Sequence, residues 1–160
     1  MSKKLRLNPR VAYFMGLYST DKDKAVGVTS DNDDVVAKFV KIAIDEFEVE
    51  PNKVLVEQSG DTQRAYFYNS KLKKLLDNAL ERKSVTFKYK NDYAAGYLAG
   101  LFDIYGGEDG RGLFIKNYDD TDFLLIENLG FHTMAHGNKL YVKNARTFLG
   151  FIKKFSERFR

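Results

Sequence analysis

Two segments of this sequence repeat each other. Residues 12–18 read Ala-Tyr-Phe-Met-Gly-Leu-Tyr and residues 96–102 read Gly-Tyr-Leu-Ala-Gly-Leu-Phe, so that Gly16 corresponds to Gly100. An internal repeat of this kind indicates that each copy opens a similar supersecondary unit. We therefore expect the chain to fold as two related halves.

The segments that follow each copy support this division. A short apolar strand and an acidic tetrad come next, at 31–34 in the first half and 119–122 in the second, and each tetrad suits the start of a helix. A hairpin then turns at 59–61 or at 137–138, and a basic amphipathic helix closes each half. The order α-β-α-β-β-α, found twice, predicts an α+β fold with two antiparallel sheets related by a pseudo-two-fold axis. The expected boundaries are 1–82 for the first repeat, 83–91 for a linker and 92–160 for the second repeat.

Small residues recur at one spacing in both copies. Ala12 and Gly16 are four apart, as are Gly96 and Gly100, so each pair lines one stripe of a helix. Such a stripe lets a second helix backbone approach closely. These four residues therefore predict that the two repeated helices pack against each other.

Composition limits the function classes. Hydrophobic residues make up 44% and charged residues 30%, which is typical of a globular protein. The chain has no cysteine, so disulfides and thiolate chemistry are excluded, and no apolar run is long enough for a membrane span. We expect a cytoplasmic monomer without a membrane partner. The net charge of +4 favours a polyanionic partner.

The repeated helix also carries a family resemblance. Residues 97–107, Tyr-Leu-Ala-Gly-Leu-Phe-Asp-Ile-Tyr-Gly-Gly, resemble the motif of the LAGLIDADG homing endonucleases, and residues 14–21, Phe-Met-Gly-Leu-Tyr-Ser-Thr-Asp, resemble a diverged first copy. The resemblance, which covers nearly the whole chain, implies two motif helices at the interface between halves. It also implies that acidic residues at the ends of these helices hold Mg²⁺ at the scissile phosphates. The two sheets would then form a saddle in the major groove of double-stranded DNA.

Several positions depart from that family pattern. The metal-binding position of the motif holds Asp21 in the first copy but Tyr105 in the second, and a neutral phenol is a poor ligand for Mg²⁺. Asp103 lies two residues too early, where the family tends to use an acid to satisfy the helix ends. Glu108 lies in the glycine-rich stretch 106–112, which we expect to be a flexible loop that lets it reach the site. Lys22 stands where the first motif would end in glycine. Each half lacks one strand of the usual pattern, unless short strands lie near Asp23 and Glu108.

The return strands of the hairpins carry candidate DNA-binding residues. With a period of two, each trio shares one sheet face, where basic side chains reach base edges or phosphates. The candidates are Arg64, Tyr66 and Tyr68 in the first half, and Lys139, Tyr141 and Lys143 in the second, with Arg111 and Lys116 extending the surface. The stretch with Lys83, Lys88 and Lys90 is expected to be a solvated linker, with a basic residue near a cleavage site as the alternative.

Three functions stay open at this point. The first is a DNA-binding protein of the LAGLIDADG type whose nuclease activity is weak or lost. The second is an active Mg²⁺-dependent endonuclease that uses Asp21 and Glu108 as catalytic residues, with Asp21 on the metal. The third is an RNA-binding protein similar to the maturases of the family. Tyr105 is the residue that separates the first two hypotheses.

Overall fold

The structure, a computed structural model, describes residues 5–21 and 23–158. Lys22 lies outside the described residues. In chain order the first half contains α1 (Pro9–Tyr18), β1 (Val26–Ser30), α2 (Asp33–Phe47), the 3-10 helix η1 (Pro51–Lys53), β2 (Leu55–Ser59), β3 (Thr62–Phe67) and α3 (Ser70–Glu81). This order agrees with the prediction for the first repeat.

The second half has one strand more than the sequence predicted. After the short helix α4 (Lys83–Thr86) come α5 (Asp92–Tyr105), β4 (Gly106–Asp109), β5 (Gly112–Lys116), α6 (Asp120–Asn128), β6 (Thr133–His136), β7 (Lys139–Val142) and α7 (Ala145–Ile152). The expectation of a flexible loop at 106–112 is wrong, because this stretch is the β4–β5 hairpin.

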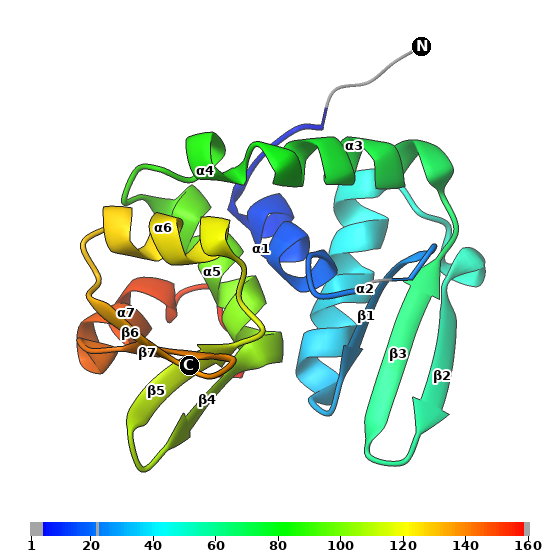
Figure 1. Ribbon diagram of the computed structural model, residues 1–160. Coiled ribbons are helices and arrows are strands. Elements are labelled where there is room, and N and C mark those ends of the chain that lie inside the picture. The colour runs from blue at the N-terminus through cyan, green and yellow to red at the C-terminus, as the bar shows by residue number, and fades with distance from the viewer. Residues whose placement is uncertain (1–4, 22, 159–160) are drawn as a thin grey trace.

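Both sheets are antiparallel and lie on either side of the central helices α1 and α5 (Figure 1). Among the described residues, the first sheet has the strand order β1-β3-β2 and the second has the order β4-β5-β7-β6. The two predicted hairpins are present as β2–β3 and β6–β7, with Val56 opposite Ala65 in the first and Ala135 opposite Leu140 in the second. The return strand of each hairpin is therefore an inner strand of its sheet.

Side-chain caps fix where the main helices begin. The Asn32 side chain accepts hydrogen bonds from the amides of Asp34 and Val35, which satisfies two free donors at the start of α2. Asp119 and Asp122 form a reciprocal capping box at the start of α6. Both acidic tetrads thus begin helices, as the sequence predicted.

The central helices cross at the two repeated glycines. A side chain at Gly16 would place its Cβ only 2.2 Å from the Tyr97 carbonyl oxygen, and one at Gly100 would lie 2.2 Å from the Tyr13 carbonyl oxygen. At Gly96, a Cβ would lie 2.5 Å from the Pro9 oxygen. The prediction that the two repeated helices pack together through their small residues is confirmed.

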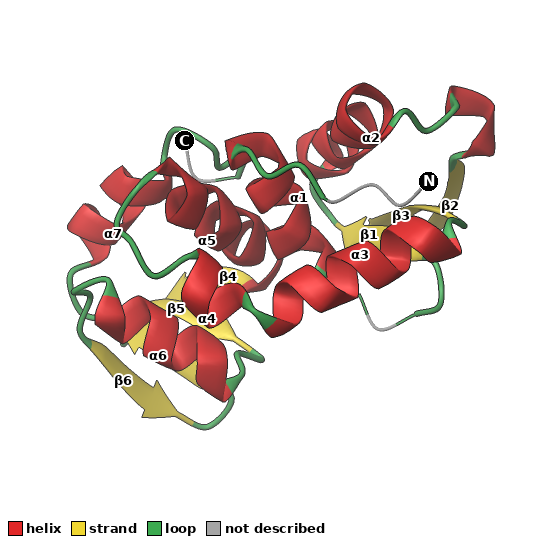
Figure 2. Cartoon of the chain, turned by 90° about the horizontal axis from the view of Figure 1, so that it is seen from above, coloured by secondary structure: helices red, strands yellow, loops and turns green. Residues whose placement is uncertain are grey.

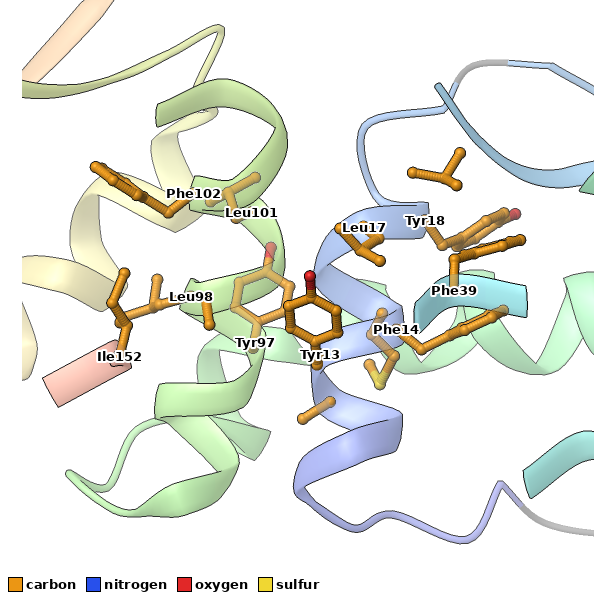
Figure 3. Packing of buried hydrophobic residues seen from close by; sticks show 14 of the residues in the cluster. Tyr13, Phe14, Leu17, Tyr18, Phe39, Tyr97, Leu98, Leu101, Phe102 and Ile152 are labelled. Carbon is orange, nitrogen blue, oxygen red and sulfur yellow. The ribbon is translucent and has the colours of Figure 1, made fainter. Parts of the chain in front are cut away.

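The core is continuous across this crossing. On the first side, Phe14 of α1 stacks on Phe39 of α2 with ring centroids 4.5 Å apart. On the other side, the Phe102 ring lies 5.5 Å from that of Phe148. Figure 3 shows Phe14 and Phe39 on one flank of the helix pair, and Leu98, Phe102 and Ile152 on the other. Burial of these side chains joins the two halves into one hydrophobic core.

The segment between the halves is anchored at two residues, which corrects the expectation of a solvated linker at Lys83, whereas Lys88 and Lys90 are exposed as expected. Lys83 is buried and contacts Asp119 and Asp122, with Nζ–O distances of 2.7 and 3.0 Å. Phe87 is fully buried and stacks on Tyr97 at 4.8 Å. Figure 2 shows α3 leading into α4, which lies beside α6. None of the helices in the described chain has the length and apolar character to cross a membrane.

Candidate nucleic-acid interface

The Asp21 carboxylate lies just past the end of α1 and already has partners. Its Oδ1 accepts a hydrogen bond from the Asp23 amide at 3.2 Å, and its Oδ2 accepts one from Arg64 Nη2 at 3.3 Å. The same Arg64 nitrogen lies 3.3 Å from Asp23 Oδ2. With its side chain only 10% exposed, Asp21 is paired with a cation from the sheet.

A glycine on β1 makes room for this carboxylate. A Cβ at Gly27 would lie 2.7 Å from Asp21 Oδ2 and 2.9 Å from the Tyr66 Cβ. Gly27 is directly opposite Tyr66 on β3, and Thr29 is opposite Arg64. Asp21 therefore rests against the sheet face that carries Arg64, and any larger residue at 27 would displace it.

Tyr105 ends α5 and crosses to the first half. Its hydroxyl donates a hydrogen bond to the Thr20 carbonyl oxygen at 3.3 Å, next to Asp21 in the chain. This contact joins the end of α5 to the first half beside Asp21. The second motif helix therefore brings a phenol, and not a carboxylate, to this place.

Asp103 is fully buried and binds the C-terminal segment. Its carboxylate accepts hydrogen bonds from the Tyr13 hydroxyl at 2.5 Å, the Ser156 hydroxyl at 2.5 Å and the Glu157 amide at 2.8 Å. Burial raises the pKa of Asp103, although these hydrogen bonds oppose the shift. Burial also raises the pKa of Tyr13 well above its usual value, with Asp103 adding to it. Asp103 therefore has a structural role and is closed off from solvent.

The tyrosine at the matching position of the second repeat is bound in a similar way. The Tyr97 hydroxyl donates to Asp122 at 2.8 Å, and Lys83 contacts the same carboxylate. Burial raises the pKa of Tyr97 and of Asp122. The sequence alternative that placed Lys83 near a cleavage site is not supported, because its ammonium group is committed to this buried cluster.

Glu108 does not join Asp21. It lies on β4 opposite Leu113, so strand alternation places it on the other sheet face from Gly107 and Asp109. Asp109 is the acidic residue of β4 that lies on the same sheet face as the basic residues. The sequence pattern did not predict this position.

On the first sheet, the predicted basic and aromatic residues form one group. Arg64 lies over the Tyr66 ring, 4.3 Å from its centroid, and the Tyr66 ring lies 5.9 Å from that of Tyr68. The Tyr66 hydroxyl donates to Glu57 at 2.6 Å. Tyr68 follows the end of β3 and is 71% exposed, so it is the member of the trio that a ligand would meet first.

On the second sheet, two of the predicted residues converge on Asp109. Lys139 Nζ lies 3.0 Å and the Tyr141 hydroxyl 2.8 Å from Asp109 Oδ2. The Arg111 amide, Lys139 and Tyr141 together hold the pKa of Asp109 at about 2. Each sheet thus pairs a cation on its return strand with an acid that follows its motif helix.

The remaining candidates are exposed around the second sheet. Lys116 ends β5 opposite Lys139, Lys143 follows β7, and Arg111 lies in the β4–β5 turn. Phe114 and Met134 are both opposite Tyr141, so the same face also carries apolar side chains that the sequence reading did not include. The sequence did not predict these neighbours because they depend on the register between strands, which no local pattern reveals.

The acidic residues do not fit a divalent metal. Mg²⁺ prefers several anionic or carbonyl oxygens in an octahedral arrangement. Asp21 instead contacts a guanidinium group, and Tyr105 occupies the matching position of α5. Within residues 5–21 and 23–158, no cluster of three or more His, Asp or Glu side chains could hold a metal ion.

Known structures show where this fold occurs. No family model matches the sequence, and no curated protein sequence matches it. I-DmoI in complex with DNA and Ca has a TM-score of 0.70, with 20% identity over 92% of this chain and 88% of the other. I-DmoI with DNA and Mn has a TM-score of 0.70, with 19% identity over 93% and 97%. Mesophilic variants of the homing endonuclease I-DmoI reach 0.69, with 18% identity over 92% and 94%.

This chain has the I-DmoI fold. The α+β architecture expected from the resemblance is therefore confirmed, and the likeness to I-DmoI extends through both halves of the chain. At this level of identity the comparison with I-DmoI establishes the fold, and the roles of individual side chains rest on the geometry described above.

Proposed function

We propose that this chain binds double-stranded DNA across the outer faces of its two sheets. The observation that carries the proposal is the shared fold with I-DmoI, whose structures contain DNA, over more than nine-tenths of the chain. The basic and aromatic side chains of β3 and β7 lie on the faces of the two sheets that point away from the core, and the net charge of +4 favours a polyanion. RNA binding is the alternative function, and the selection experiment described below distinguishes it from DNA binding.

We further propose that the chain does not cut both DNA strands. I-DmoI structures contain Ca, Mn or Mg, which supports divalent metal use in that protein. Metal-assisted hydrolysis needs carboxylates that fix the ion. Here Asp21 is paired with Arg64 and Tyr105 takes the other helix end.

Selection from random DNA duplexes tests the binding. We expect enrichment of one sequence over roughly 20 base pairs, with affinity that falls steeply as salt rises because phosphate contacts dominate. The same assay with the matching RNA duplex as competitor tests RNA binding, and effective competition by RNA would favour the maturase-like rival.

A double charge reversal locates the surface. Lys139→Glu with Lys143→Glu should abolish binding, since both lysines lie on or beside the face of the second sheet. Lys153→Glu with Lys154→Glu makes the same charge change past the end of α7, where both lysines are exposed, and is the matched control. Equal losses in the two variants, or no enriched sequence, would contradict the sheet-face interface.

Incubation of the selected duplex with protein and Mg²⁺ or Mn²⁺ tests the second proposal. We expect no two-strand product, and Tyr105→Asp should raise cleavage above that of the unaltered chain because it restores a second carboxylate. Efficient two-strand cutting by the unaltered chain would contradict this proposal and the interpretation of the Asp21 site on which it rests.

A further inference from the structure

The surroundings of Asp21 are closed by groups of the chain itself. One carboxylate oxygen of Asp21 accepts a hydrogen bond from the Asp23 amide, and the other accepts one from Arg64. Gly27 of β1 lies against the second oxygen. A metal ion would need at least one of these oxygens and would have to approach a fixed positive charge.

Arg64 is held in place from several sides. It lies on β3, which is paired with β1 on one side and with β2 on the other, so its backbone is fixed at Thr29 and Glu57. Its guanidinium group lies over the Tyr66 ring at 4.3 Å and contacts Asp23 as well as Asp21. The Arg64 side chain is only 19% exposed. Because the Tyr66 ring, Asp21 and Asp23 all contact its guanidinium group, Arg64 is part of this site and not a freely moving surface residue.

Charge repulsion gives this arrangement a consequence for metal ions. Two positive charges repel, and for a divalent ion about 5 Å from a guanidinium group the effect on affinity, without salt screening, is about tenfold at the dielectric constant of water. The effect is larger at a half-buried site, where the solvent screens less. Arg64 therefore acts against metal binding in addition to occupying a carboxylate oxygen.

We propose that Arg64 is a built-in counter-ion for Asp21 that excludes divalent metal ions from the end of α1, and that its removal creates a metal site from Asp21 and Asp23. The inference deepens the proposed function, because it gives a physical reason why two-strand cleavage is absent. It concerns the free protein, so it stands or fails independently of DNA binding.

Line broadening by Mn²⁺ in NMR spectra of the free chain tests this proposal at the site itself. The reporter is the Gly27 amide, since Gly27 lies against the Asp21 carboxylate. In Arg64→Met, which keeps an unbranched side chain over Tyr66, the Gly27 signal should broaden at about tenfold lower Mn²⁺ than in the unaltered chain. Adding Asp21→Asn to Arg64→Met should abolish this gain.

Lys139→Met is the matched control, because it removes a sheet-face cation from a different carboxylate, Asp109. It should leave the Gly27 response unchanged. The proposal is overturned if Gly27 broadens at the same Mn²⁺ concentration in the unaltered chain and in Arg64→Met. Should Arg64→Met fail to fold, the unaltered chain still decides: selective broadening of Gly27 at Mn²⁺ concentrations that spare the exposed acidic residues would refute exclusion by Arg64.

Discussion

Alanine at position 100 should destabilise the protein although alanine is the better helix former. A Cβ at Gly100 would lie 2.2 Å from the Tyr13 oxygen, 2.9 Å from the Leu17 nitrogen and 3.0 Å from the Gly16 Cα. All three are backbone atoms of α1, so no side chain can rotate away, and the helices must separate by about 1 Å to reach ordinary contact distances.

The net effect follows from two opposing terms. Overpacking a buried contact costs about 1–3 kcal/mol, and a backbone clash belongs at the upper end of that range. Replacing glycine by alanine inside a helix stabilises the folded state by about 1 kcal/mol. We therefore expect Gly100→Ala to lower the free energy of unfolding by about 2 kcal/mol, and Gly100→Leu to lower it further.

Urea unfolding followed by circular dichroism measures this change. The matched control is Gly150→Ala on α7, where a Cβ would have no atom within 4 Å, so helix propensity alone should stabilise the chain by up to about 1 kcal/mol. The two glycine-to-alanine changes should thus have opposite signs. If Gly100→Ala is as stable as the unaltered chain, the tight crossing of α1 and α5 is wrong.

Three further predictions concern single side chains. Tyr105→Phe removes the hydrogen bond to Thr20 and should lower the free energy of unfolding in urea by about 0.5–1.5 kcal/mol; no change would mean that this bond is not formed in solution. The Asp109 carboxyl, with a pKa of about 2, should titrate near pH 2 in an NMR pH titration. Lys139→Gln should raise the pH of this titration midpoint because it removes the ion pair. An unchanged midpoint would exclude the ion pair. Because the folded-state pKa of Asp103 is raised, the folded chain binds this proton more tightly than the unfolded chain. The contribution of Asp103 to the free energy of unfolding should therefore fall as pH rises from about 3.9 through the folded pKa, and urea titrations at several pH values should show this fall as the difference between the unaltered chain and Asp103→Asn.

The helix crossing was predictable because it depends on a local pattern. Gly16 and Gly100 occupy matching positions, and interior glycine costs a helix about 0.5–1 kcal/mol, so its recurrence indicates close contact between backbones. The partner of Asp21 was not predictable, because Arg64 reaches it only through the register of β3 with β1. Pairing across a sheet is set by tertiary packing, which no spacing in the sequence reports.

The strand β4 was only an alternative in the sequence analysis because its first two residues are glycines. Glycine is depleted in strands and typical of loops, so Gly106-Gly107 predicted flexibility. In the structure, close packing leaves no room for a side chain at either glycine. A Cβ at Gly106 would lie 2.4 Å from the Phe102 oxygen, and one at Gly107 would lie 2.6 Å from the Phe114 ring. A propensity rule failed here because close packing, and not backbone freedom, requires glycine.

The complete burial of α1 has a consequence for synthesis on the ribosome. Residues 11–18 are all buried, and the face that carries Gly16 is covered by α5, which emerges from the ribosome only after the whole first half. Until then, the nascent first half exposes an apolar helix surface that it cannot cover itself. Stalled nascent chains in which residue 92 has not yet left the ribosome should therefore be more prone to aggregation and to chaperone capture than chains in which residue 105 has emerged, because only the latter expose the helix that completes the core.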